Sequence, residues 1–98
     1  MPSVVVQITR VIDDDYPIFI EFTLTDADGK LHLFHDKLPI IDAAPDKQFD
    51  PTGKLGELPC TVIEHGDDLA VIDTTQPASV ASTEDQTEFR VSAELIRP

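Results

Sequence analysis

The sequence predicts an all-β fold, and two features of its 98 residues carry that prediction. Valine and isoleucine together outnumber leucine 17 to 8, and β-branched side chains favour the pleated surface of a sheet. Apolar residues also alternate with polar ones, most clearly over residues 18–24 and 89–95, which is the side-chain period of a strand. About five to six such strands with hairpin connections predict a small antiparallel barrel, OB-like or SH3-like, and a two-sheet sandwich is the alternative.

The clearest pair of strands lies within residues 17–37. Its centre, Asp26-Ala27-Asp28-Gly29, has the aspartate and the glycine expected of a type I turn followed by a left-handed glycine. With the turn's aspartate opposite Lys30, Phe22 pairs with Phe34. This register predicts a core face made of Ile18, Ile20, Phe22, Leu24 and Phe34, and an outer face that carries Glu21, Thr23, Thr25, Leu31, Leu33 and His35.

The chain before and after this hairpin gives weaker signals. Residues 37–41 are expected at a sheet edge because Pro39 interrupts a ladder. Residues 42–59 contain three prolines, two glycines and no sustained periodicity, which predicts a long irregular loop anchored by Phe49, Leu55 and Leu58. Residues 4–12 are expected to form a strand with Val4, Val6, Ile8 and Ile12 on one side and Val5, Gln7, Thr9 and Val11 on the other.

The last third of the chain predicts a second hairpin and a closing strand. Residues 60–64 and 69–73 are its strands, and a two-residue turn at Gly66-Asp67 would pair Ile63 with Ala70. Further expectations are a very short strand at 80–82, a turn at 84–86 and a final strand at 87–95. Residues 93–97 are an alternative site for a helical turn. Residues 1–98 are expected to be one domain.

The charge of the chain narrows its possible partners. Seven basic and nineteen acidic residues leave a net charge of −12, which repels nucleic acid phosphates and anionic lipid headgroups. We therefore expect no nucleic acid partner and no membrane partner. The start of the chain lacks the pattern of a signal peptide, and no segment has the ~20 apolar residues of a membrane helix. A cytoplasmic location follows as an expectation.

Metal binding and catalysis are not expected. His32-x-x-His35 and Cys60-x4-His65 resemble two pairs of zinc ligands, but odd spacings place the members of each pair on opposite faces of a strand. No nucleophile motif or phosphate-binding glycine loop is present. A single cysteine cannot form an internal disulfide. We therefore expect no cofactor and favour a protein that is not an enzyme.

The leading functional hypothesis is a module that binds a basic protein through an acidic surface, as an immunity-type inhibitor of a basic toxin or nuclease would. The candidate binding residues are Asp13, Asp14 and Asp15, with Asp67 and Asp68 as a second group. One alternative is a homo-oligomer that self-associates through an exposed strand, suggested by outward apolar residues at Val5, Val11, Leu31 and Leu33. Another is a small-ligand or enzymatic site in the mouth of a barrel, near residues 42–59.

Three motifs follow one another along the chain. They are Phe34-x-Asp36-Lys37-x-Pro39, Pro59-Cys60-x-Val62, and Pro77-x-x-Val80-x-Ser82-x-Glu84 through Phe89-x-Val91. In order and spacing they resemble a set of small, uncharacterised bacterial β-rich proteins, over most of the chain from about residue 4 to residue 95. The resemblance implies a compact β domain and a bacterial source, and it assigns no activity to any residue.

Overall fold

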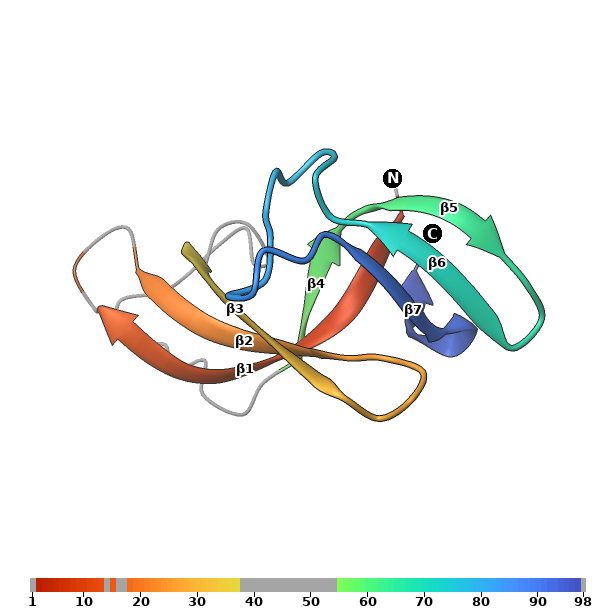
Figure 1. Cartoon of the computed structure of the whole chain (residues 1–98). Helices are drawn as coiled ribbons and strands as arrows, with labels where there is room; N and C mark the ends of the chain where they lie inside the picture. The colour runs from red at the N-terminus through yellow and green to blue at the C-terminus, as the bar shows by residue number, and fades with distance from the viewer. Residues whose placement is uncertain (1, 14, 16–17, 38–54, 98) are drawn as a thin grey trace.

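The computed structural model describes residues 2–13, 15, 18–37 and 55–97, and it is all-β, as the sequence predicts. The elements are β1 Ser3–Asp13, β2 Phe19–Thr25, β3 Leu31–Lys37, β4 Leu55–Pro59, β5 Thr61–His65, β6 Leu69–Asp73, β7 Glu88–Ser92, the 3-10 turn η2 Ala93–Leu95 and β8 Ile96–Arg97. Figure 1 shows two antiparallel sheets, one with the order β3-β2-β1-β4 and the other with the order β5-β6-β7. The short strand β8 also pairs with β1, and over the described residues these ladders do not join into one closed barrel.

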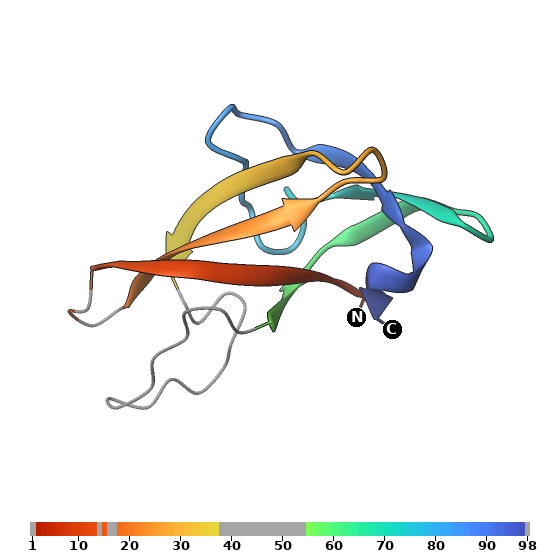
Figure 2. The same ribbon diagram turned by 90° about the horizontal axis from the view of Figure 1, so that it is seen from below.

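Backbone hydrogen bonds connect the two sheets, and two of these bonds adjoin the strands of the second sheet. At one, β4 runs directly into β5 through Cys60, whose N–H donates to the carbonyl of Pro2 at 3.1 Å. At the other, the N–H of Ala27 in the β2–β3 turn donates to the carbonyl of Arg90 on β7 at 2.8 Å. Because β8 pairs with the start of β1, the first and last described strands lie side by side near the second sheet (Figure 2).

The predicted β2–β3 hairpin and its register are confirmed. Phe22 lies opposite Phe34, and the core-face residues Ile20, Phe22, Leu24 and Phe34 are fully buried. In the turn, Gly29 has a φ of +84°, a conformation that glycine adopts without a steric penalty. The Asp26 side chain closes the turn, since its Oδ1 accepts hydrogen bonds from the N–H groups of Asp28 and Lys30.

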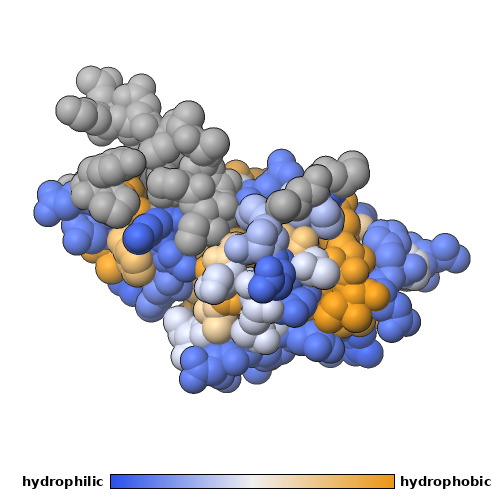
Figure 3. Space-filling view, turned by 90° about the horizontal axis from the view of Figure 1, so that it is seen from above, coloured by the Kyte–Doolittle hydropathy of each residue, from blue (hydrophilic) through white to orange (hydrophobic). Residues whose placement is uncertain are grey.

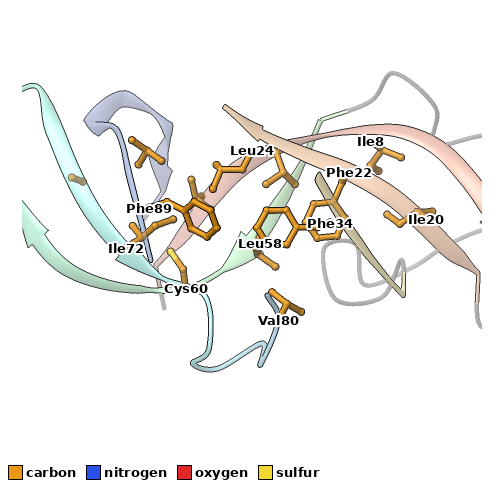
Figure 4. Packing of buried hydrophobic residues seen from close by; sticks show 14 residues of the cluster. Ile8, Ile20, Phe22, Leu24, Phe34, Leu58, Cys60, Ile72, Val80 and Phe89 are labelled. Carbon is orange, nitrogen blue, oxygen red and sulfur yellow. The ribbon is translucent and has the colours of Figure 1, made fainter. Parts of the chain in front are cut away.

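Aromatic side chains connect the two sheets at the centre of the core. Phe22 and Phe34 stack with ring centroids 5.1 Å apart and planes 3° from parallel. Phe34 also packs against Phe89 of the second sheet, with ring centroids 5.6 Å apart. Figure 4 shows Leu58 and Ile72 packed around these rings. The hydrophobic core is therefore shared by both sheets and does not belong to either sheet alone.

The predicted faces of β1 are correct at its start and wrong at its end. Val4, Val6 and Ile8 are buried, but the register with β2 shifts after Ile8 and again after Val11, and each shift adds one residue to β1. These β-bulges interrupt the alternation. Val11 consequently packs against the core instead of facing outward, and Ile12 is 43% exposed instead of buried.

The predicted irregular loop at 42–59 is wrong in its last part, because residues 55–59 form β4 and pair with β1. Leu58 is buried as expected, whereas Leu55 is 71% exposed and is therefore not a core residue. Their odd separation places them on opposite faces of the strand. Residues 38–54, which include Phe49 and most of the predicted edge segment, lie outside the described residues.

The second hairpin is present with a different register. His65 lies opposite Ala70, and the ladder has a bulge at Ile63, which is 54% exposed. The N–H of Gly66 donates to the carbonyl of Leu69 at 2.8 Å, so the turn residues are Asp67 and Asp68, one position later than predicted. A Cβ at Gly66 would lie 3.2 Å from that carbonyl. The glycine therefore permits a close backbone approach beside the turn.

The predictions for the end of the chain are partly confirmed. Residues 80–82 do not form the expected strand: the Ser82 N–H donates to the Gln86 carbonyl across a turn, and Thr83 makes a single backbone bond to Leu33 on β3. One such bond is too few for a ladder. The predicted final strand ends at Ser92, and the alternative of a helical turn is realised as η2.

Candidate functional site

The two groups of predicted acidic binding residues lie far apart. Asp13 and Asp15 are exposed at the end of β1, where the Asp15 N–H donates to Oδ1 of Asp13 at 3.0 Å, and Asp14 is outside the described residues. Asp67 and Asp68 form the tip of the β5–β6 hairpin. Figure 1 shows these two places at opposite ends of the molecule. The structure therefore does not combine them into one surface.

The outer face of the second sheet provides neighbours for Asp67 and Asp68. Glu64 on β5 lies opposite Val71 on β6, which lies opposite Arg90 on β7, so these three residues form a row across the sheet. The residues that alternate with them, Ala70, Ile72, Phe89 and Val91, face the core and are buried.

This row and the turn enclose a concavity of about 350 Å³. Leu69, which is 42% exposed, and Val71 contribute its apolar surface. Three carboxylates border this apolar surface, two of them from the turn itself. We call this concavity the acidic cleft, and its lining residues are Glu64, Gly66, Asp67, Asp68, Leu69, Val71 and Arg90.

Hydrogen bonds hold both sides of the acidic cleft in place. The carbonyl of Asp68 accepts a hydrogen bond from the N–H of Ala93 in η2 at 2.9 Å, and the carbonyl of Arg90 accepts one from Ala27. The Arg90 guanidinium contacts the carboxylate of Asp28 at 3.3 Å. Because both side chains are more than half exposed, this ion pair adds little stability. Its effect is to place a carboxylate beside the one cationic side chain of the cleft.

The surface view shows how apolar and polar groups are distributed near this site. A hydrophobic patch lies over β5 and β6, and hydrophilic residues surround it toward the β5–β6 turn (Figure 3). Ile63 on the β5 bulge and Leu69 are among the exposed large hydrophobic residues of the described chain. Exposed apolar groups with a charged rim are typical of interaction surfaces.

The histidines bind carboxylates separately on the two faces of the first sheet. Nε2 of the buried His32 lies 2.7 Å from Oδ2 of Asp26, and this hydrogen bond is the main reason that the pKa of Asp26 is lowered. On the outer face, Nε2 of His35 lies 3.0 Å from Oε2 of Glu21 and chiefly lowers the pKa of that carboxyl. The prediction that His32 and His35 face opposite sides is confirmed.

Cys60 and His65 do not converge either. Cys60 is buried, and desolvation raises the pKa of its thiol to about 11, whereas His65 is exposed beside the acidic turn. Across the residues that the structure describes, no group of three or more histidine, cysteine or acidic side chains is arranged to hold a metal ion. Cys60 also borders a second, mostly apolar concavity of about 510 Å³ with Pro2, Thr61, Val62, Gln76 and Pro77. A thiol with a raised pKa is a poor nucleophile at neutral pH.

Only part of the acidic cleft could be predicted from the sequence. Asp67 and Asp68 were predicted as binding residues, whereas Glu64, Arg90 and the apolar floor formed by Leu69 and Val71 were not. The signal for the floor was present, because the alternation over residues 69–73 already separates Leu69 and Val71 from the buried Ala70 and Ile72. The contributions of Glu64 and Arg90 depend on pairing between strands and have no local signal.

Comparison with known proteins found no matching family model, no matching curated protein and no matching solved structure. No helix in the described parts of the chain is long and apolar enough to cross a membrane.

Proposed function

We propose that this protein is a non-enzymatic module that binds a basic protein, and that the acidic cleft is its contact surface. The observation that carries the proposal is that three carboxylates and an apolar floor line one concavity. The carboxylates are those of Glu64, Asp67 and Asp68, and the floor is formed by Leu69 and Val71. Apolar contact supports affinity, while complementary charge accelerates encounter and selects the partner. The net charge of −12 adds a long-range attraction for a basic surface.

The cleft is favoured over the group at Asp13, Asp14 and Asp15. The bond between Asp13 and the backbone of Asp15 is the usual arrangement of a solvated aspartate turn. By contrast, the carboxylates of the cleft adjoin apolar side chains that would lose water on contact with a partner. Inhibition of a basic toxin or nuclease, in the manner of an immunity protein, is one concrete form of this function.

A titration of the isotope-labelled protein with a lysine-rich peptide tests the proposal by amide chemical shifts. We expect the largest shifts at residues 64–71, and we expect ~0.5 M salt to suppress them because screening weakens exposed charge pairs. The double variant Asp67→Asn/Asp68→Asn should bind less tightly, and the matched control Asp13→Asn/Asp15→Asn should bind like the wild type. Shifts confined to the end of β1, or binding that salt leaves unchanged, would contradict the proposal.

Self-association is the second candidate, because Leu31 and Leu33 on β3 are 58% and 41% exposed. Two features oppose it. The Leu33 carbonyl on the outer edge of β3 already accepts a hydrogen bond from Thr83, and Val11 packs against the core instead of contributing to an outer patch. Sedimentation at micromolar concentration separates the two hypotheses, since a monomer excludes the homo-oligomer.

Three further proposals concern the source of the protein, its location and its architecture. The resemblance to small bacterial proteins supports a bacterial source, and a cytoplasmic location is proposed with it. A barrel-like arrangement, open between the two sheets, is supported by the direct passage of β4 into β5 and by the hydrogen bond between the β2–β3 turn and β7.

A further inference from the structure

We propose that the acidic cleft takes a lysine side chain from the partner, with its aliphatic stem on the apolar floor and its ammonium group at the carboxylates. This inference rests on the proposed function and specifies the chemical group that the site recognises. Three features of the cleft support it: the apolar floor formed by Leu69 and Val71, the charges around that floor and the dimensions of the site.

The floor suits the stem of the lysine. Leu69 and Val71 are two residues apart on β6, so their side chains lie on the same outer face of the sheet. Leu69 is 42% exposed, which leaves apolar surface that a partner can cover. Lysine side chains lay their methylene groups along apolar surface while the charged end stays near water.

The charges suit the ammonium end. Glu64 lies to one side of Val71, and Asp67 and Asp68 lie at the turn beyond Leu69, so carboxylates occur on two sides of the floor. Arg90 lies on the remaining side, but its guanidinium contacts the carboxylate of Asp28. An ammonium group has three donors on a flexible stem and can meet carboxylates that are not coplanar.

The site has room for one extended side chain of a partner, and two alternative occupants fit it less well. A volume of about 350 Å³ is near the lower end of the range for small-molecule pockets, and the site is open to solvent. Addition of a partner strand to the edge of β5 that pairs with no described strand fits less well, because the bulge at Ile63 interrupts that edge. A second copy of this chain is disfavoured by a net charge of −12 on each molecule.

Three peptides that differ at one central position distinguish the contribution of the aliphatic stem from that of the ammonium charge. The position carries lysine, norleucine, which keeps the stem without the charge, or diaminopropionic acid, which keeps the charge on a short stem. We expect the lysine peptide to bind at least about tenfold more tightly than either analogue, because each analogue loses one of the two contacts. Titration calorimetry with the intact protein at low salt gives the three dissociation constants.

Variants of the protein provide the matching test. Leu69→Ser should weaken binding of the lysine peptide about fivefold and leave the diaminopropionic peptide unchanged, since only the longer stem reaches the floor. Leu31→Ser, an exposed leucine on β3 in the other sheet, is the control and should change neither. Circular dichroism confirms that both variants fold.

The outcomes separate this inference from the proposed function. Equal affinities for the lysine and diaminopropionic peptides would overturn the role of the floor and leave an acidic module that binds by charge alone. Equal affinities for lysine and norleucine would overturn the role of the ammonium group. If none of the peptides shifts residues 64–71, both the inference and the proposed function fail.

Discussion

Phe34 is expected to connect the two sheets, and its substitution tests the architecture. The side chain is fully buried, stacks on Phe22 from the first sheet and contacts Phe89 from the second. Replacement by leucine keeps most of the apolar volume, which by itself costs less than about 1.5 kcal/mol. The two lost aromatic contacts are worth about 0.5–1.5 kcal/mol each. We therefore expect Phe34→Leu to lower the free energy of unfolding by about 2–3 kcal/mol.

The neighbouring residue on the same strand is a matched control. Leu33 is 41% exposed on the opposite face of β3, so Leu33→Ala should change the free energy of unfolding by no more than about 0.5 kcal/mol. The two variants therefore compare adjacent positions that differ in the direction of their side chains.

Urea unfolding followed by circular dichroism measures both changes. We expect a lower midpoint for Phe34→Leu with an unchanged slope, and a curve for Leu33→Ala that overlays the wild type. In a domain of this size, each kcal/mol corresponds to a fall in Tm of about 4–8 °C. A loss for Leu33→Ala as large as that for Phe34→Leu would refute the assigned faces of β3 and the shared core.

The other predictions concern single groups. The pKa of Asp26 is lowered in the folded protein mainly by the hydrogen bond with His32. The ionised carboxylate therefore stabilises the fold fully above its ordinary pKa of about 4, and this stabilisation is lost as pH falls through the lowered pKa of the folded state. Asp26→Asn should lower the free energy of unfolding at pH 7 and flatten its fall below about pH 4, which urea unfolding at a series of pH values measures. Cys60, with its pKa raised to about 11, should react with a thiol reagent at pH 8 only after denaturation, and fast labelling of the native protein would contradict its burial. Gly29→Ala should lower the free energy of unfolding by about 1–2 kcal/mol because of the positive φ alone, since no atom lies within 4 Å of the added Cβ. A much larger loss of stability in thermal unfolding would indicate a steric clash instead.

The fold was most predictable where the information is local. The β2–β3 hairpin was predicted with its register, because one turn sequence, Asp26-Ala27-Asp28-Gly29, determines which residues lie opposite each other. The alternation of side chains then assigned Phe22 and Phe34 to the core. Both steps need only neighbouring residues, and no distant partner alters them.

The errors occur where a distant strand sets the conformation. The bulges in β1 and β5 reverse the direction of side chains at Val11 and Ile12 and expose Ile63. A bulge exists only relative to a partner strand, so no local pattern marks it. In the same way, residues 55–59 read as a loop because of their glycine and proline, and they are a strand because β1 pairs with them.

The candidate site shows the same division. The amino-acid sequence by itself determined the acidity of the molecule, the all-β class and the exposed aspartates of the β5–β6 turn. Only the tertiary structure decided that Glu64, Val71 and Arg90 lie in one row beside that turn, and that Asp13 and Asp15 lie at the other end of the molecule. The physical reason is that charge and alternation are properties of the chain, whereas a concavity exists only after separate strands have paired.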